Sequence, residues 1–310
     1  MGNLQQTINW AQTQVEYVPL TAGLGQEPAV SAATAIRDSF LSAPMTWYWN
    51  RASFTLPSPT TKGTQDYNIL LTSIPDFGFL EKVALTDPNG KIWEIKDIYN
   101  SSPLSQATDQ QRPNGAAVQS VTSTNLVLRF IGVPNAAYTV AITYQKKAQS
   151  FGPFFITAAG NAAAGNTAYT GTFDPLSFPT GSTAIITGFV AHTVNNGSFV
   201  VVSCTTTTLT VANAGGVAET ISAFANNFDW APIPDYYRDI YNNLFLSEMM
   251  WDDPQRAQIH RQRGVGAFLA KAQGLNDMQK NAFAQQWMAR SSEEVTNSML
   301  TQIGNSGRGV

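Results

Sequence analysis

Histidine and cysteine, which often serve as nucleophiles, bases and metal ligands, are scarce in this chain. There are two histidines, His192 and His260, and one cysteine, Cys204. His192 and Cys204 fall in one β-rich segment, where a Cys–His dyad is conceivable. A small buried thiol and a surface histidine explain the same two residues. A zinc site would need both histidines and further ligands, which no Cys or Asp/Glu cluster supplies. We expect no metal, no cofactor and no catalytic residue.

Paired carboxylates are the next candidates for chemistry, because glycosidases use two carboxyl groups that face each other across a cleft. Asp76 and Glu81 bracket the sequence FGFL, and Asp252 and Asp253 are adjacent. Asp76 follows a proline and is typical of a turn, whereas Asp253 precedes Pro254 and is typical of a helix N-cap. Both pairs are better explained by structure than by catalysis.

A basic stripe is predicted on a helix that begins at Pro254. Its charged face carries Arg256, His260, Arg263 and Lys271, and Arg261 points toward the opposite, apolar face of Val265, Phe268, Leu269 and Ala272. Gly264 and Gly266 weaken the helix prediction in the middle. A solvated helix face is one interpretation. The other is a contact with an acidic partner surface or with passing nucleic acid, which such charges would steer.

The overall composition restricts the class of protein. Charged residues make up 13% of the 310 residues, against about 25% in an average globular protein. The net charge of −3 argues against a protein that wraps nucleic acid. The N-terminus lacks the basic and apolar regions of a secretory signal, and no run approaches the roughly 18 apolar residues of a membrane span. We expect no membrane partner.

Helices are predicted at both ends of the chain, over residues 1–51 and 225–303, followed by a flexible arm at 304–310. Pro28, the pair Asp253–Pro254, and capping boxes at Asn276 and Ser291 mark helix starts. The apolar stripes at helical spacing are Leu4, Ile8, Ala11 and Val15; Ala29, Ala33, Ile36 and Phe40; and Tyr237, Ile240, Tyr241, Leu244, Phe245 and Glu248. Because both ends flank the same β region, we expect them to pack together.

Two β regions are predicted between the helices. Residues 52–150 form an antiparallel domain, with two short strands around the glycine of FTLPSPTTKGTQDYNILL, a hairpin at Asp87–Gly90, and another strand pair turning at Pro134–Asn135. Residues 151–224, in a stretch without lysine or arginine, form an inserted small β-sandwich with a linker at Ala158–Ala168. The predicted class is α+β, a helical bundle with an antiparallel β domain and this insertion.

The C-terminal sequence IPDYYRDIYNNLFLSEMMWDDPQRAQIHRQRGVGAFLAKAQGL resembles the same region of head-to-tail adaptor (connector) proteins of tailed phages, of the tail tubular protein A type. PMTWYWNR, GTQDYNI and FGFLEKVALTD near the front also fit. The resemblance covers about residues 3–150 and 225–305. The insertion resembles immunoglobulin-like modules of phage virion proteins, which typical adaptors lack. Its role is left open among decoration, tail stiffening and weak surface adhesion.

The resemblance implies a structural virion protein of the phage neck, made and assembled in the host cytoplasm. Its subunits form a ring, expected to be a dodecamer, that joins the portal protein to a downstream tail or nozzle protein. The ring extends the channel through which genomic DNA passes without sequence-specific binding. The chain end is expected to dock into the portal, with Val295, Met299 and Ile303 as apolar anchors and Arg308 as a charged one.

Two alternatives remain open at this point. One is another phage tail, baseplate or receptor-binding component that uses the β-module to bind carbohydrate. Exposed rings among Tyr169, Phe173, Phe178, Phe189 and Phe199 would favour it. The other is a glycosidase-like enzyme, for which a convincing acid–base pair is missing.

Overall fold

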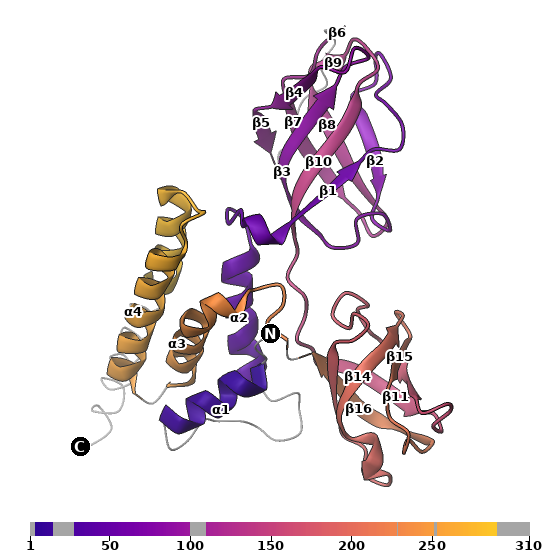
Figure 1. Ribbon diagram of the computed structural model, residues 1–310, viewed down its shortest axis with the longest axis vertical. Coiled ribbons are helices and arrows are strands. Elements are labelled where there is room, and N and C mark those ends of the chain that lie inside the picture. The colour runs from indigo at the N-terminus through magenta and orange to yellow at the C-terminus, as the bar shows by residue number, and fades with distance from the viewer. Residues whose placement is uncertain (1–3, 15–27, 100–109, 228, 251–252, 290–310) are drawn as a thin grey trace, which may run out of the picture. The chain divides into compact units, whose positions relative to one another are not determined.

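The computed structural model describes residues 4–14, 28–99, 110–227, 229–250 and 253–289 (Figure 1). The chain divides into two compact units. One spans Leu41–Ala148, and the other combines Met1–Phe40 with Gln149–Val310. The fold is of mixed α+β class, with several antiparallel sheets and a six-stranded barrel. Among the described helices, none is both long enough and apolar enough to cross a membrane.

The unit that contains both chain ends holds all the α-helices described. These are α1 (Leu4–Gln14), α2 (Ala29–Leu41), α3 (Arg238–Met249), α4 (Pro254–Lys271) and a further helical segment over residues 277–289. The predicted apolar stripes are confirmed as buried faces with three exceptions: Glu248 is only half-buried, Leu269 of the predicted apolar face of α4 is exposed, and Val15 lies outside the described residues.

The predicted helix starts are confirmed by their hydrogen bonds. The side chain of Asp253 accepts a bond from the backbone N–H of Arg256 at 3.0 Å, and Pro254 opens α4. Asn276 and Gln279 form the expected capping box, each backbone N–H donating to the other's side-chain oxygen at 2.9 Å. The box at Ser291 lies outside the described residues. These starts depend on local chemistry, and the sequence therefore predicts them well.

Helices from the two ends of the chain share one aromatic core. The ring of Phe40 in α2 meets Tyr237, Phe268 and Phe283 edge-on, with centroid distances of 6.0, 5.7 and 5.4 Å. Two hydrogen bonds accompany these contacts. Thr7 donates to Asn242, 235 residues away, at 2.9 Å, and the Trp287 indole donates to Ser39 at 3.1 Å. The expected packing between the two ends is thus visible in specific side-chain contacts.

A buried arginine connects these helices to the inserted strands. Arg37 of α2 is 0% exposed, and its guanidinium donates hydrogen bonds to the carbonyl oxygens of Gln149 and Asp229. The same group lies 3.2 Å from the ring centroid of Phe151. Burial lowers the pKa of Arg37 to about 9, so the group stays charged at neutral pH. Arg37 therefore fixes the points where the chain enters and leaves the inserted β region.

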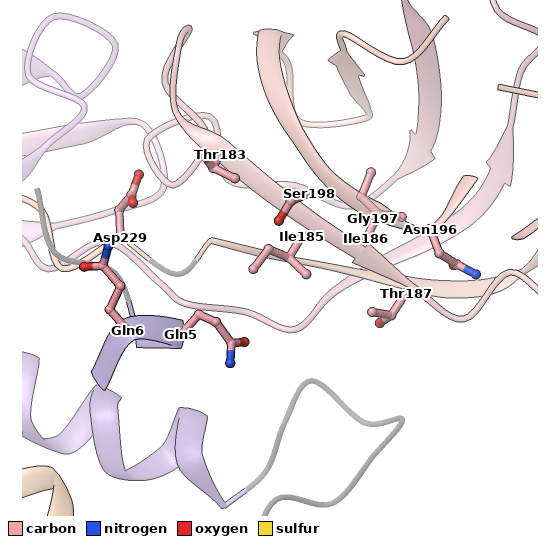
Figure 2. Close-up of a pocket in the computed structure, with 10 residues that line it drawn as sticks. All are labelled: Gln5, Gln6, Thr183, Ile185, Ile186, Thr187, Asn196, Gly197, Ser198 and Asp229. Atoms are coloured by element: carbon pink, nitrogen blue, oxygen red, sulfur yellow. The ribbon is translucent and has the colours of Figure 1, made fainter. Parts of the chain in front are cut away.

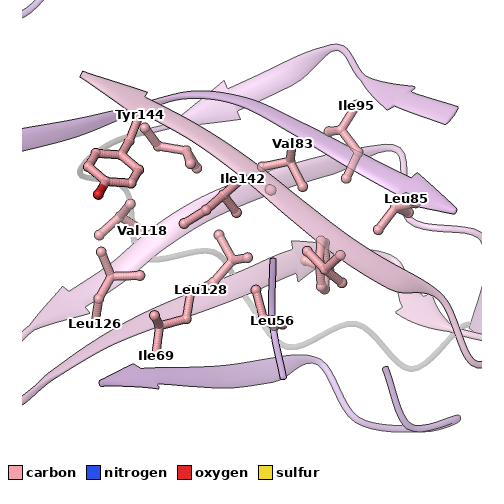
Figure 3. Close-up of a cluster of buried hydrophobic side chains, with 14 of the residues drawn as sticks. Leu56, Ile69, Val83, Leu85, Ile95, Val118, Leu126, Leu128, Ile142 and Tyr144 are labelled. Carbon is pink, nitrogen blue, oxygen red and sulfur yellow. The ribbon is translucent and has the colours of Figure 1, made fainter. Parts of the chain in front are cut away.

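The Leu41–Ala148 unit contains two four-stranded sheets that share one apolar core, part of which Figure 3 shows. The first sheet has the order β1 (Arg51–Thr55), β10 (Thr139–Lys146), β3 (Phe77–Thr86), β4 (Ile92–Ile95). The second has the order β2 (Asp66–Leu70), β8 (Asn125–Ile131), β7 (Gly115–Val121), β5 (Asp97–Tyr99). A short parallel pair is formed by β6 (Gln110–Gln111) and β9 (Val133–Pro134).

One of the two predicted strand pairs in this unit is confirmed. The turn at Asp87–Gly90 joins β3 to β4, and the carboxylate of Asp87 accepts the N–H groups of Asn89 and Lys91. The two short strands predicted around a glycine are present as β1 and β2, on either side of Gly63, and they belong to different sheets. The pair predicted at Pro134–Asn135 is wrong, because β8 and β10 also belong to different sheets. Alternating burial looks the same in a hairpin and in a chain that crosses between sheets, so the pattern could not separate them.

The inserted region closes into a barrel, where the sequence predicts a sandwich. Its strands are β11 (Phe154–Ala159), β12 (Thr167–Gly171), β13 (Thr183–Thr187), β14 (Gly197–Cys204), β15 (Thr208–Val211) and β16 (Glu219–Asn227). Strand β11 pairs with both β12 and β16, which removes the open edges of a sandwich. The linker predicted at Ala158–Ala168 is wrong, because these residues belong to the β11–β12 hairpin, where small side chains suit the turn.

Helix α4 runs without a break through both glycines, and the two glycines differ in surroundings. A Cβ on Gly264 would lie 2.8 Å from the buried side chain of Leu244, whereas a Cβ on Gly266 would meet nothing within 4 Å. We expect Gly264→Ala to destabilise the protein by about 1 kcal/mol, because overpacking outweighs the gain in helix propensity. The matched change Gly266→Ala should stabilise it by up to about 1 kcal/mol. Urea unfolding of both variants measures this, and equal effects would contradict close α3–α4 packing.

The two hydrogen bonds that Arg37 donates to backbone carbonyl groups predict a second stability effect. Arg37→Met keeps much of the side-chain volume but leaves two partly buried carbonyl groups without their donor, which should cost about 3 kcal/mol. Arg263→Met, on the exposed face of α4 in the same unit, should stay within about 0.5 kcal/mol of the parent. Unfolding followed by the helical circular dichroism band reports on this unit. Equal stability of the two variants would show that the Arg37 hydrogen bonds do not stabilise the junction between α2 and the inserted strands.

Candidate functional site

The structure brings three of the four predicted basic-stripe residues to one hollow. Arg256, His260 and Arg263 of α4 line a cavity of about 270 Å³ together with Gln14, at the end of α1, and Ile259. We call this hollow the basic pocket. The Nε atom of Arg256 lies 3.9 Å from a carboxylate oxygen of Asp253. Because the three basic residues recur every three to four positions, they fall on one side of the helix, as the sequence predicts.

Lys271, the fourth member of the predicted stripe, has a different environment. Its ammonium group donates to the carbonyl oxygen of Tyr236 at 2.9 Å and pairs with Asp239 at 2.5 Å. It also lies 4.8 Å from the Tyr236 ring centroid. Lys271 therefore ties α4 to the start of α3 and does not contribute to the basic pocket.

Arg261 is buried, as the sequence predicts for its side of the helix. Its guanidinium lies 3.6 Å from the carboxylate of Glu248 on α3. The basic side chains of α4 therefore have three roles. Arg261 is internal, Lys271 is paired, and the remaining three face the basic pocket.

Neighbouring groups define the protonation of His260. Its Nδ1 lies 3.0 Å from the side-chain oxygen of Asn243, whose amide group donates to the Asp239 carbonyl at 2.7 Å. That bond orients the Asn243 amide, so Nδ1 carries the imidazole hydrogen and Nε2 is free to take up a proton. Burial lowers the pKa of His260, and Arg263 and Arg256 lower it further. His260 is therefore neutral at physiological pH.

The conceivable Cys204–His192 dyad finds no support in the local chemistry. The Cys204 thiol lies 3.3 Å from the carbonyl oxygen of Thr205, and burial, followed by the charge of Asp174, raises its pKa to about 11. A catalytic thiol needs the opposite shift, because the thiolate is the nucleophile. The backbone N–H of His192 donates to Glu219, which holds this loop in place.

The candidate carboxylates have structural partners. Asp76 accepts a hydrogen bond from the Tyr144 hydroxyl at 2.7 Å, and Glu81 accepts bonds from Arg51 at 2.9 Å and Gln145 at 2.5 Å. Asp253 is the helix cap described above, and Asp252 lies outside the described residues. These contacts join strands and cap a helix, and they account for the carboxylates without a catalytic role.

The predicted portal contacts lie outside the described residues, and the predicted carbohydrate-binding rings of the barrel are mostly buried. The portal-contact residues Val295, Met299, Ile303 and Arg308 lie outside the described residues. In the barrel, four of the five aromatic rings considered for carbohydrate binding are buried, and Phe199 is partly buried. They form the barrel core and offer no exposed platform for stacking against sugar rings. Phe155 is the exposed ring of β11, and it packs beside Phe224.

A second hollow was not predicted from the sequence. It has a volume of about 480 Å³ and lies between the start of α1 and strands β13 and β14. Figure 2 shows Gln6 beside Asp229, and Gln5 below β13. Its polar lining consists of short hydroxyl and amide groups with one carboxylate. Such residues carry no sequence pattern that distinguishes a hollow from any polar surface.

Comparisons with known proteins assign no family. No family model matches the chain, and no curated protein or solved structure matches it either. Within the residues that the structure describes, no three His, Cys, Asp or Glu side chains gather closely enough to hold a metal ion. Among the candidates, the basic pocket on α4 has the most definite chemistry, because two arginines and one histidine line it.

The pKa of Cys204 predicts how the thiol reacts. Alkylation by iodoacetamide should be slow at neutral pH and should rise with an apparent pKa of about 11, because burial disfavours the thiolate. The rate measured across a pH series tests this, with His192→Ala as the control that should leave the profile unchanged. A fast rate near neutral pH that His192→Ala abolishes would establish the dyad instead.

Proposed function

We propose that this chain is a structural head-to-tail adaptor of a tailed phage, whose copies form a dodecameric ring between the portal and the tail. The observation that carries the proposal is the shared helical core. Helix α2 comes from one end of the chain, and α4 and the helical segment over residues 277–289 come from the other; they meet around Phe40, with both β regions between them in the sequence. This agrees with the order of elements in the family that the chain resembles.

Surface composition supports a role in assembly. The chain has few charges to desolvate, and the helical segments expose several large apolar side chains. Tyr236 is 59% exposed and Met278 is 70% exposed, and Ile259 and Leu269 of α4 are also exposed. Aromatic residues and methionine are enriched in protein interfaces, whose cores are depleted of charge. A heterologous contact that repeats around an axis would close such subunits into a ring.

We further propose that the barrel takes the place of the immunoglobulin-like modules of phage virion proteins. One observation supports carbohydrate binding as a second candidate function. Phe155 is 59% exposed beside Phe224, so the barrel has one surface aromatic pair that could stack on a sugar. This feature supports the alternative of a tail or receptor-binding component that adheres to carbohydrate. Loss of glycan binding in Phe155→Ala, together with failure to bind a portal, would favour that alternative.

The portal complex provides the test of the main proposal. When the protein is mixed with the portal ring of the same phage, the ring should gain about 400 kDa, which is twelve times the chain mass of 33.5 kDa. Native mass spectrometry measures the gain, and negative-stain images should show an added ring below the portal. An unchanged portal mass would contradict the adaptor proposal.

Two variants test the proposed contact between the C-terminal arm and the portal. Truncation after Gln302 removes Ile303 and Arg308, and Arg308→Glu reverses the charge. Both should keep the helical circular dichroism of the parent and lose the gain in portal mass, because the arm provides apolar and charged anchors. Normal binding by the truncated protein would show that the portal contact lies elsewhere.

A further inference from the structure

The basic pocket differs from a merely charged helix face, because residues from two helices line one hollow. Two arginines and one histidine line a hollow of about 270 Å³, and none of the five described residues that line it is acidic. Gln14, from a different helix, adds an uncharged amide to the rim. Arginine presents a planar fork of donors that suits oxyanions. Four polar groups from two helices thus surround one small space.

The described carboxylates near the basic pocket pair with residues outside it or lie at its edge. On α3, Asp239 pairs with Lys271 and Glu248 faces Arg261 on the buried side. Asp253 approaches Arg256 only at 3.9 Å, and one of its oxygens already caps the helix. Among the residues that the structure describes, the carboxylates therefore compensate little of the positive charge of this pocket.

His260 gives this pocket a response that a plain arginine pair lacks. The groups facing it are Asn243 from α3, Gln14 from α1, and Arg256 and Arg263 from its own helix. Burial, and then the charges of these two arginines, disfavour its protonated form. A bound anion would reverse that balance, so that Nε2 takes up a proton and becomes a further donor.

We propose that the basic pocket binds a phosphate group, held by Arg256, Arg263 and His260. A phosphate fits better than a single carboxylate, because its oxygens can accept from three separate donors and its charge can balance more than one cation. The same chemistry serves a free phosphate, a phosphate monoester, or a phosphodiester of a nucleic acid. The inference rests on the pocket and does not depend on the adaptor proposal.

The chain's two histidines make the test direct. The ring C–H signals of His260 and His192 can be followed by NMR across a pH series, and His192, in the barrel, serves as the internal reference. At constant ionic strength set by sodium chloride, inorganic phosphate should raise the pKa of His260 by about 1, which means about tenfold tighter binding to the protonated form. The signal of His192 should not respond.

Matched variants identify the donors. Arg256→Gln and Arg263→Gln should each reduce the response of His260, and the double variant should abolish it. Lys62→Gln, which removes one exposed positive charge in the other unit, should leave it intact. The fold of each variant is checked by circular dichroism. A full response in the double variant would overturn the proposal.

Separate ligands distinguish the sources of phosphate. A response to inorganic phosphate alone supports a free phosphate or a monoester as the ligand. A response to a DNA duplex that weakens as salt rises supports a nucleic-acid backbone. If neither moves His260, or if only poly-glutamate moves it, the pocket is not a phosphate site, and the second result would assign it to an acidic protein partner.

Discussion

The burial of one guanidinium group is the constraint on which the larger unit depends. Removing a charge from water is costly unless it is hydrogen-bonded, and Arg37 is fully buried in α2. Its partners are backbone carbonyls at Gln149 and Asp229 and the ring face of Phe151. Because these partners flank the inserted strands, Arg37 can donate to both carbonyl groups only when both ends of the insertion reach α2.

A chain of rings extends this junction into the C-terminal helices. Phe151 packs edge-on against Trp230 at 5.3 Å, and Trp230 stacks on Tyr241 of α3 at 4.4 Å. The Trp230 indole donates to Thr7 of α1, which in turn donates to Asn242. The barrel ends, the N-terminal helices and α3 are therefore joined by continuous contacts, and α3 positions the His260 side of α4 through Asn243.

What could be predicted from the sequence is what depends on neighbouring residues in the chain. The apolar stripes, the cap at Asp253 and the box at Asn276 follow from spacing and local hydrogen bonding. Strand pairing could not be predicted in the same way, because the partner of β8 is decided by the sheet to which its distant neighbours belong. Closure of the barrel likewise depends on β11 meeting β16, more than sixty positions later in the chain.

The candidate site shows the same division. The spacing of Arg256, His260 and Arg263 was sufficient to predict a common face, and the position of Arg261 was sufficient to predict its burial. The pairing of Lys271 depends on Asp239 of another helix, and the tautomer of His260 depends on Asn243. Arg37 gave no sequence signal, since a single arginine in an apolar helix looks the same whether it is exposed or buried.

The contacts around Phe40 and Arg37 imply that the two ends of the chain form one cooperative core. Amide hydrogen exchange in increasing urea, followed by mass spectrometry on peptides from α2 and α4, measures the opening free energy of each helix. We expect both helices to exchange through the same opening, with the same free energy and the same urea dependence. If α2 opened at much lower free energy than α4, the two ends would be separate elements, and the shared core would be contradicted.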